Sequence, residues 1–269
     1  LILSACGGGG GGGSGVQSNF SGFVIKGPLQ NAQVFADYNN DGILGSDEPT
    51  VLTNSDGSYT LSAFDNFGAI VVQTDDNTID SSSGEVLSGV TLKAPKGAQV
   101  VSPTSTMVVE SNLSVSEVAE VLGLPADFDL DFNPFDANAD RDKAAAVEKT
   151  SQMLMSTINA ISASAEGVGL SKTDSFKTAI EAIIEVVKEN IITKAVIDLS
   201  DDNILNDVSA KAVQAATKRG ADETSVNRAM NEAVNTTKAV NKSIKAVEDV
   251  FSEDAKLVFK QVSQVRETA

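Results

Sequence analysis

The N-terminal half of the fold is set by one stretch of sequence, which runs Ala32-Gln33-Val34-Phe35-Ala36-Asp37-Tyr38-Asn39-Asn40-Asp41-Gly42-Ile43-Leu44-Gly45-Ser46-Asp47-Glu48-Pro49. Its first five residues favour a strand, because Val34 and Phe35 suit a pleated, half-buried surface. The next twelve residues carry side-chain oxygens at loop positions one, three, five and twelve. Pro49 disfavours a helix directly after them. The stretch therefore predicts a strand that leads into a metal-type loop.

The loop matches the calcium template at every position. That template takes side-chain ligands from positions 1, 3 and 5, a backbone carbonyl from 7 and a bidentate Glu from 12, with Gly at 6 for the sharp turn. The predicted ligands here are Asp37, Asn39, Asp41, the carbonyl of Ile43, and Glu48, with Gly42 at the turn. One calcium ion is the predicted cofactor, and magnesium is a weaker alternative because its strict octahedron suits so many protein oxygens poorly. A second alternative is a pair of Asx turns without metal, in which the carboxylates only accept backbone N–H bonds.

Short β-type runs separated by turn residues fill residues 20–103. Their spacing predicts an antiparallel β-sandwich with the calcium loop at one end. The expected strands are residues 23–25, 32–36, 51–53, 58–61, 69–73 and 89–92. The polar segment from Asp75 to Gly84 shows no ligand spacing, so we expect a solvated loop there.

After Pro103 the β-type runs give way to helical periodicity, which predicts an α-helical bundle over residues 104–269. A capping box of Ser114 and Glu117 marks the start of one helix. The expected helices cover residues 114–123, 141–166, 172–192, 203–218 and 226–251, with a last helix that begins after 252–254.

Two features of this half admit alternatives. Residues 226–251 place Val226, Met230, Ala233, Thr237, Val240, Ile244, Val247 and Phe251 at steps of four and three, which is a seam for packing against another helix. Because Ala and Thr occupy some of the seam positions, we favour packing of this helix within the chain. The alternative is self-association, or contact with other envelope proteins, through residues 226–251. Within the acidic connection 127–140, Asp136, Asn138 and Asp140 have the spacing of a second cation loop. Arg141 stands in place of the turn Gly, however, and Val147 in place of the final Glu. We therefore expect its acids to lie at the next helix N-terminus and its phenylalanines to pack on the core.

Composition limits the classes of function. The 269 residues carry a formal net charge of −17, so the chain offers no basic face for nucleic acid. The chain has no His and a single Cys, which removes His-based triads, His–zinc sites and internal disulfides. We predict no catalytic residues and a role other than an enzyme. A hydrolase that uses an Asp/Glu pair is a weak alternative, because such a pair is set by the fold rather than by spacing.

The N-terminus resembles a lipid attachment signal. Leu3-Ser4-Ala5-Cys6 is similar to a bacterial lipobox, and residues 7–19 are rich in Gly, which suits a flexible tether. The resemblance implies that Cys6 carries the lipid, that 1–6 is the remnant of a signal peptide and that its upstream part is missing. The residue directly after Cys6 is Gly7 rather than Asp, which resembles the pattern of lipoproteins that are sorted to the outer membrane. We therefore expect a protein that is lipid-anchored at the bacterial outer membrane or cell surface.

A second resemblance covers about residues 20–125. Gly27-Pro28-Leu29-Gln30-Asn31-Ala32, the loop that ends at Glu48-Pro49, and Thr53-Asn54-Ser55-Asp56-Gly57-Ser58-Tyr59 resemble the B-repeat and carboxypeptidase-regulatory-like sandwiches of bacterial adhesins. The resemblance implies a transthyretin-like Greek-key sandwich stiffened by calcium. Some related sandwiches carry a Lys–Asn isopeptide bond that is promoted by a Glu. Thr91 stands at the position of that Glu, so we expect Lys26 to be an ordinary strand residue.

Taken together, these features predict an outer-surface lipoprotein with a structural, adhesive or assembly role. The alternative is a ligand-binding lipoprotein of an envelope uptake system, which would need an enclosed pocket of several hundred Å³. The predicted organisation is a signal remnant at 1–6, a tether at 7–19, the sandwich at 20–103 and the helical domain at 104–269.

Overall fold

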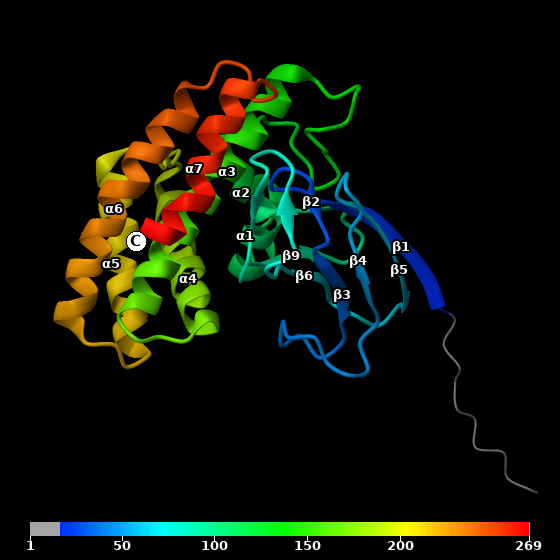
Figure 1. The fold of residues 1–269 in the computed structure, drawn as a ribbon, viewed down its shortest axis with the longest axis horizontal. Coiled ribbons are helices and arrows are strands. Elements are labelled where there is room, and N and C mark those ends of the chain that lie inside the picture. Colours follow the sequence, from blue (N-terminus) through cyan, green and yellow to red (C-terminus); the bar gives the residue numbers. More distant parts are fainter. Residues whose placement is uncertain (1–16, 269) are drawn as a thin grey trace, which may run out of the picture.

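The computed structural model describes residues 17–268, in which strands precede helices (Figure 1). The fold is mixed α+β, as predicted, with β-sheets in the N-terminal part and helices in the C-terminal part. The strands are β1 (Gln17–Val24), β2 (Leu29–Gln30), β3 (Gln33–Asp37), β4 (Thr50–Leu52), β5 (Ser58–Phe64), β6 (Ala69–Gln73), β7 (Ile79–Asp80), β8 (Glu85–Val86), β9 (Thr91–Pro95) and β10 (Val100–Val101).

The strands form three small sheets. Their orders are β10-β1-β5, β2-β7-β8 and β4-β3-β6-β9. All pairs are antiparallel except β1 with β10, which is parallel and aligns Val24 with Val101. In β5, buried Tyr59, Leu61 and Ala63 alternate with more exposed residues, as expected for a strand with one face on the core. The central strands β3 and β6 are buried along almost their whole length.

The helices are α1 (Pro103–Ser111), α2 (Val115–Val121), α3 (Arg141–Gly167), α4 (Lys172–Thr193), α5 (Asp202–Lys218), α6 (Glu223–Ala246) and α7 (Glu253–Thr268). Five of them begin where the sequence placed a cap or a periodic run, and the Ser114–Glu117 capping box is present at α2. Asp140 caps α3, and Phe128 and Phe132 pack against the core, so the acidic connection behaves as expected. Within residues 17–268, no helix is long and apolar enough to cross a membrane.

Two predictions about helices were wrong. The sequence did not predict α1, because its Thr104, Thr106, Val108 and Val109 favour strands; the capping box of Ser102 with Ser105, and Pro103 in the first turn, start the helix instead. The seam helix was predicted to continue to residue 251, but α6 ends at Ala246, so Val247 and Phe251 lie beyond it.

The remaining seam residues pack against other helices of the same chain. Val226, Met230, Ala233, Thr237, Val240 and Ile244 are all buried, and α6 packs against α3, α5 and α7. Self-association stays a prediction, and its surface would have to lie outside these six side chains.

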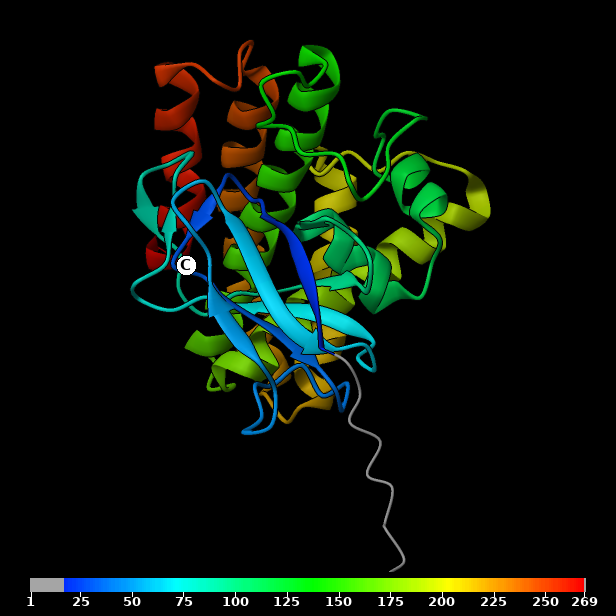
Figure 2. The same cartoon turned by 90° about the vertical axis from the view of Figure 1, so that its right-hand side faces the viewer.

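The two parts of the chain share their apolar interior. One cluster of buried side chains extends from Val24 in β1 to Val265 in α7. α3 runs through the middle of the helices and is buried on most of its surface, and α1 packs on β9. Figure 2 shows the sheets in front of the helices. Both candidate sites described below lie near this boundary, because Gln152 of α3 contacts Lys26 and because residues 41–43 line a cleft together with α4.

Candidate functional site

The predicted metal loop connects β3 to β4. Asp37 is the last residue of β3 and is buried, with 2% of its surface exposed. Its Oδ2 accepts a hydrogen bond of 2.9 Å from the backbone N–H of Gly42. Gly42 adopts a φ of +73°, which a residue with a Cβ rarely adopts, so the glycine at loop position six makes the turn possible. Position six therefore folds back onto position one, as a calcium-type loop requires.

Glu48 closes the loop from its other end. Its Oε1 accepts the N–H of Tyr38 at 2.8 Å, and its Oε2 accepts the N–H of Gly45 at 2.8 Å. Glu48 is almost fully buried. The carboxylate at position twelve is therefore returned to the start of the loop, beside the residue that follows Asp37.

The two remaining side-chain ligands are exposed and make Asx-type turns. Asn39 Oδ1 accepts the N–H of Asp41 at 3.0 Å, and Asp41 Oδ1 accepts the N–H of Ile43 at 2.7 Å. The amide of Asn39 also donates to Asp41 Oδ2 at 2.9 Å. These bonds are the ones that the metal-free alternative predicts.

One atom in the loop has no partner among the residues that the structure describes. Asp37 Oδ1 is buried and accepts no hydrogen bond. A buried carboxylate oxygen without a donor or cation is costly, so its place at loop position one favours a cation nearby. The donor set is chemically suited to Ca²⁺, because it consists only of oxygens. Over residues 17–268, however, no three acidic side chains are gathered closely enough to form a ready metal cluster.

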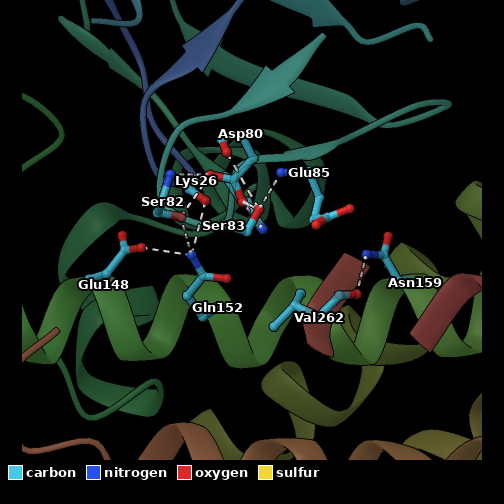
Figure 3. Close-up of polar contacts among 9 residues, drawn as sticks. All are labelled: Lys26, Asp80, Ser82, Ser83, Glu85, Glu148, Gln152, Asn159 and Val262. Atoms are coloured by element: carbon cyan, nitrogen blue, oxygen red, sulfur yellow. Dashed lines mark hydrogen bonds and ion pairs between the residues drawn. The ribbon is translucent and has the colours of Figure 1, made fainter. Parts of the chain in front are cut away.

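A second cluster of ionic groups is completely buried (Figure 3). The amine Nζ of Lys26 lies 2.5 Å from Oδ2 of Asp80, and both side chains are 0% exposed. Asp80 also accepts bonds from the hydroxyls of Ser82, at 2.7 Å, and Ser83, at 2.8 Å. Lys26 lies in the turn between β1 and β2, and Asp80 ends β7.

Helix α3 contributes the other side of this cluster. Gln152 donates to Glu148 Oε1 at 2.7 Å, to the backbone carbonyl of Lys26 at 3.1 Å and to Ser82 Oγ at 3.2 Å. Glu148 is fully buried, and burial raises its pKa to about 7. The cluster therefore joins the turn after β1 and the segment after β7 to the helical part of the chain.

This buried ionic cluster corrects two expectations and adds a residue that sequence patterns missed. Lys26 was expected to be an ordinary strand residue, but it is in a turn and its side chain is fully buried. The segment 75–84 was expected to be a solvated loop, but Asp80 and Ser83 are buried in it. Sequence patterns did not single out Glu148, which points inward and is fully buried. The available signal was the spacing of Glu148 one turn before Gln152, on the same face as buried Ala144 and Met155.

A cleft of about 620 Å³ lies between the sheets and the helices. Asp41, Gly42 and Ile43 of the metal loop form part of one wall, together with residues of β6 and β9. The facing wall comes mainly from α4, which Figure 1 shows beside the sheets. Sequence patterns did not predict this cleft, because it exists only where two distant parts of the chain meet.

The comparisons with known proteins give no relative for this chain: no family model, no curated protein and no solved structure matches it. Cys6, the predicted lipid attachment site, lies outside the described residues.

Proposed function

We propose that this chain is a surface lipoprotein with a structural, adhesive or assembly role, whose N-terminal strands are braced by one calcium ion. The brace would be held by Asp37, Asn39, Asp41, the carbonyl of Ile43, and Glu48. The single observation that supports the calcium brace is Oδ1 of Asp37 at the first ligand position, which is buried and has no hydrogen-bond partner among residues 17–268. Calcium would supply the charge that this oxygen lacks, and it would tie the end of β3 to the start of β4.

The finer architecture is part of the proposal. We assign the N-terminal strands to a transthyretin-like Greek-key sandwich, on the strength of the sequence resemblance and of the antiparallel pairing of β3 with β4 and β6. A brace suits such a module better than a switch, because strands rather than a pair of helices flank the loop. The proposed location is the outer membrane or cell surface.

Calcium binding is tested by thermal unfolding of residues 17–269 in EDTA and at increasing calcium concentration. A ligand that binds only the folded state raises the melting temperature in proportion to RT ln(1 + [L]/Kd). An unchanged melting temperature at millimolar calcium would remove the brace. Magnesium at the same concentrations should give a smaller shift, because it suits this many protein oxygens poorly.

The lipid anchor is tested separately in a bacterial host. The full chain should partition into detergent, and its N-terminal peptide should carry the mass of acyl chains on Cys6. The Cys6→Ser variant should be released in soluble form. If wild type and variant fractionate identically, the proposed lipid anchor is wrong.

A ligand-binding role in envelope uptake is the second candidate, and the cleft is the observation that favours it. A cleft of about 620 Å³ falls in the size range of small-molecule sites, which usually combine apolar walls with a few polar groups. This role is compatible with the brace, because the metal loop forms part of the cleft wall.

A further inference from the structure

The charges of the cleft differ from those of the chain as a whole. The sequence contains 37 acidic residues and only 20 lysines and arginines. Five of these lysines and arginines line the cleft, together with four carboxylates. The cleft lining therefore carries a slight net positive formal charge on an otherwise acidic protein. Such a local excess attracts anions by raising the potential inside a partly enclosed space.

Three of the cationic side chains are available for a ligand. Lys93 pairs with Glu110 at 2.7 Å, and Arg219 pairs with Glu181 at 2.8 Å, so these two are already neutralised. The others are Lys172, Lys177 and Lys188, all on exposed positions of α4. None of the three forms an ion pair among residues 17–268. Glu185 is the acidic lining residue of α4 that partly offsets them.

The same cleft also has apolar walls. Phe176, Ile180 and Ile184 of α4 line it from the helical side, and Val90 lines it from the sheet side. Ile43, in the metal loop, is 54% exposed and lies at its edge. An apolar surface of this kind favours a ligand that has a hydrophobic part as well as a charge.

From these observations we infer that the cleft binds a small amphipathic anion, and that calcium in the loop strengthens the binding. The ligand class is a carboxylate, sulfonate or phosphate carried on an apolar group. The anionic end lies near Lys172 and Lys177, which lie within about one turn of Phe176 on α4, and the apolar part lies on Phe176 and Ile180. The inference rests on the proposed calcium site and on the proposed ligand-binding role, and it adds the ligand class and the linkage between the two sites.

The linkage follows from charge and position. The three predicted carboxylate ligands, Asp37, Asp41 and Glu48, carry three negative charges, and a bound Ca²⁺ reduces their sum to one. Asp41 lies in the cleft wall itself, so calcium removes repulsion that an anionic ligand would feel. The ion also fixes the backbone of Gly42, whose carbonyl accepts a bond of 3.1 Å from Gln73 in the same wall. By thermodynamic reciprocity, the ligand must then strengthen calcium binding by the same factor.

The test uses 8-anilinonaphthalene-1-sulfonate, a sulfonate on apolar rings, whose fluorescence is titrated with the protein at fixed ionic strength. The expected result is saturable binding at one site, tightened by calcium relative to EDTA by about 5-fold to 150-fold, the usual range for coupled sites. The reverse titration must show calcium binding strengthened by the same factor when the probe is present.

Charge-reversal variants locate the site. The double variant Lys172→Glu/Lys177→Glu should weaken probe binding by about tenfold or more, because it places like charge against the anion. The matched control is Lys218→Glu/Lys256→Glu, which makes the same change of net charge at exposed positions outside the cleft. Circular dichroism and the melting temperature establish that both variants are folded.

The outcomes separate this inference from the proposals beneath it. Equal weakening by the two double variants would overturn the cleft as the binding site. Calcium that raises the melting temperature but leaves probe affinity unchanged would overturn the linkage and keep the brace. Calcium without effect on either would overturn both the brace and the linkage.

Discussion

The amine Nζ of Lys26 lies 2.5 Å from Oδ2 of Asp80 with neither side chain exposed, so this ion pair is wholly desolvated. Its members come from a turn after β1 and from the end of β7, which belong to different sheets. The carboxylate of Asp80 has further hydrogen-bond donors, because Ser82 and Ser83 also donate to it. It therefore holds one arrangement of the two segments, since any other would leave a buried charge unpaired.

Replacement of Lys26 by Met should destabilise the protein strongly. The substitution leaves the Asp80 carboxylate buried without its cation, and loss of one partner from a buried pair costs about 3–5 kcal/mol. Urea unfolding followed by circular dichroism measures the change. Lys211→Met serves as the control, because its pair with Glu189 is at the surface and should contribute little. Similar losses in the two variants would contradict the special status of Lys26.

Acidification from pH 8 to pH 6 should stabilise the protein through Glu148. The pKa of Glu148 is raised from 4.5 to about 7 by burial, so the folded state binds its proton more tightly than the unfolded state does. The stability that this proton provides is fully present below pH 4.5 and is lost as the pH rises through about 7. The chain has no His, so no imidazole competes in this window.

Glu148→Gln is the variant that isolates this effect. Glutamine is neutral at every pH, so the slope of melting temperature against pH between 5 and 8 should flatten in the variant. The Gln side chain keeps an acceptor for the amide of Gln152, which preserves the local bond. A variant with the wild-type slope would show that another group titrates.

Within the metal loop, Asp37→Asn should abolish stabilisation by calcium, whereas Asp47→Asn should preserve most of it. Both changes remove one negative charge from the loop, but Asp37 occupies the first ligand position and Asp47 the eleventh, where the template has no ligand. When the calcium concentration is 100 times its Kd, calcium should raise the free energy of unfolding of the wild type by about 2.7 kcal/mol. For a chain of this size, this corresponds to a rise of several degrees in the melting temperature. Isothermal calorimetry provides an independent measure. Equal losses would mean that calcium responds only to net charge.

At the turn before β5, Gly57→Ala should destabilise more than Gly97→Ala. Both glycines have positive φ, +78° and +94°, but a Cβ at Gly57 would lie 2.6 Å from the backbone oxygen of Val24, whereas at Gly97 it would meet nothing within 4 Å. The left-handed backbone alone costs about 1–2 kcal/mol for a residue with a Cβ. Gly57→Ala adds a clash with backbone that cannot move freely. Chemical denaturation of the two variants gives the comparison.

The sequence predicted those elements whose signals are local. Three such signals depend on a few neighbouring residues, and the structure contains all of them. They are the alternation of buried and exposed residues in Ser58–Phe64, the capping box of Ser114 and Glu117, and the acidic residues at the start of α3. Gly42 and its return to Asp37 likewise follow from the spacing of a single loop. The calcium ion itself stays a prediction.

The features that the sequence did not predict depend on contacts between distant segments. Whether Lys26 is exposed or buried is decided by where residue 80 and α3 come to lie, and nothing near residue 26 encodes that position. The inward carboxylate of Glu148 is an exception to the usual exposure of acidic residues, so a pattern search assigns it to solvent. The cleft depends in the same way on how α4 meets the sheets.

The apolar cluster that extends from Val24 to Val265 has a consequence for the evolution and engineering of this chain. Domains that are joined only by a linker can be duplicated, transferred or lost by recombination at that linker. Here a break at residue 103 would expose the apolar surfaces that β9 and α1 bury against each other. It would also expose Glu148 to water on the helical fragment. The strands and helices are therefore expected to be inherited as one unit, and a fusion partner is best attached at a terminus rather than between them.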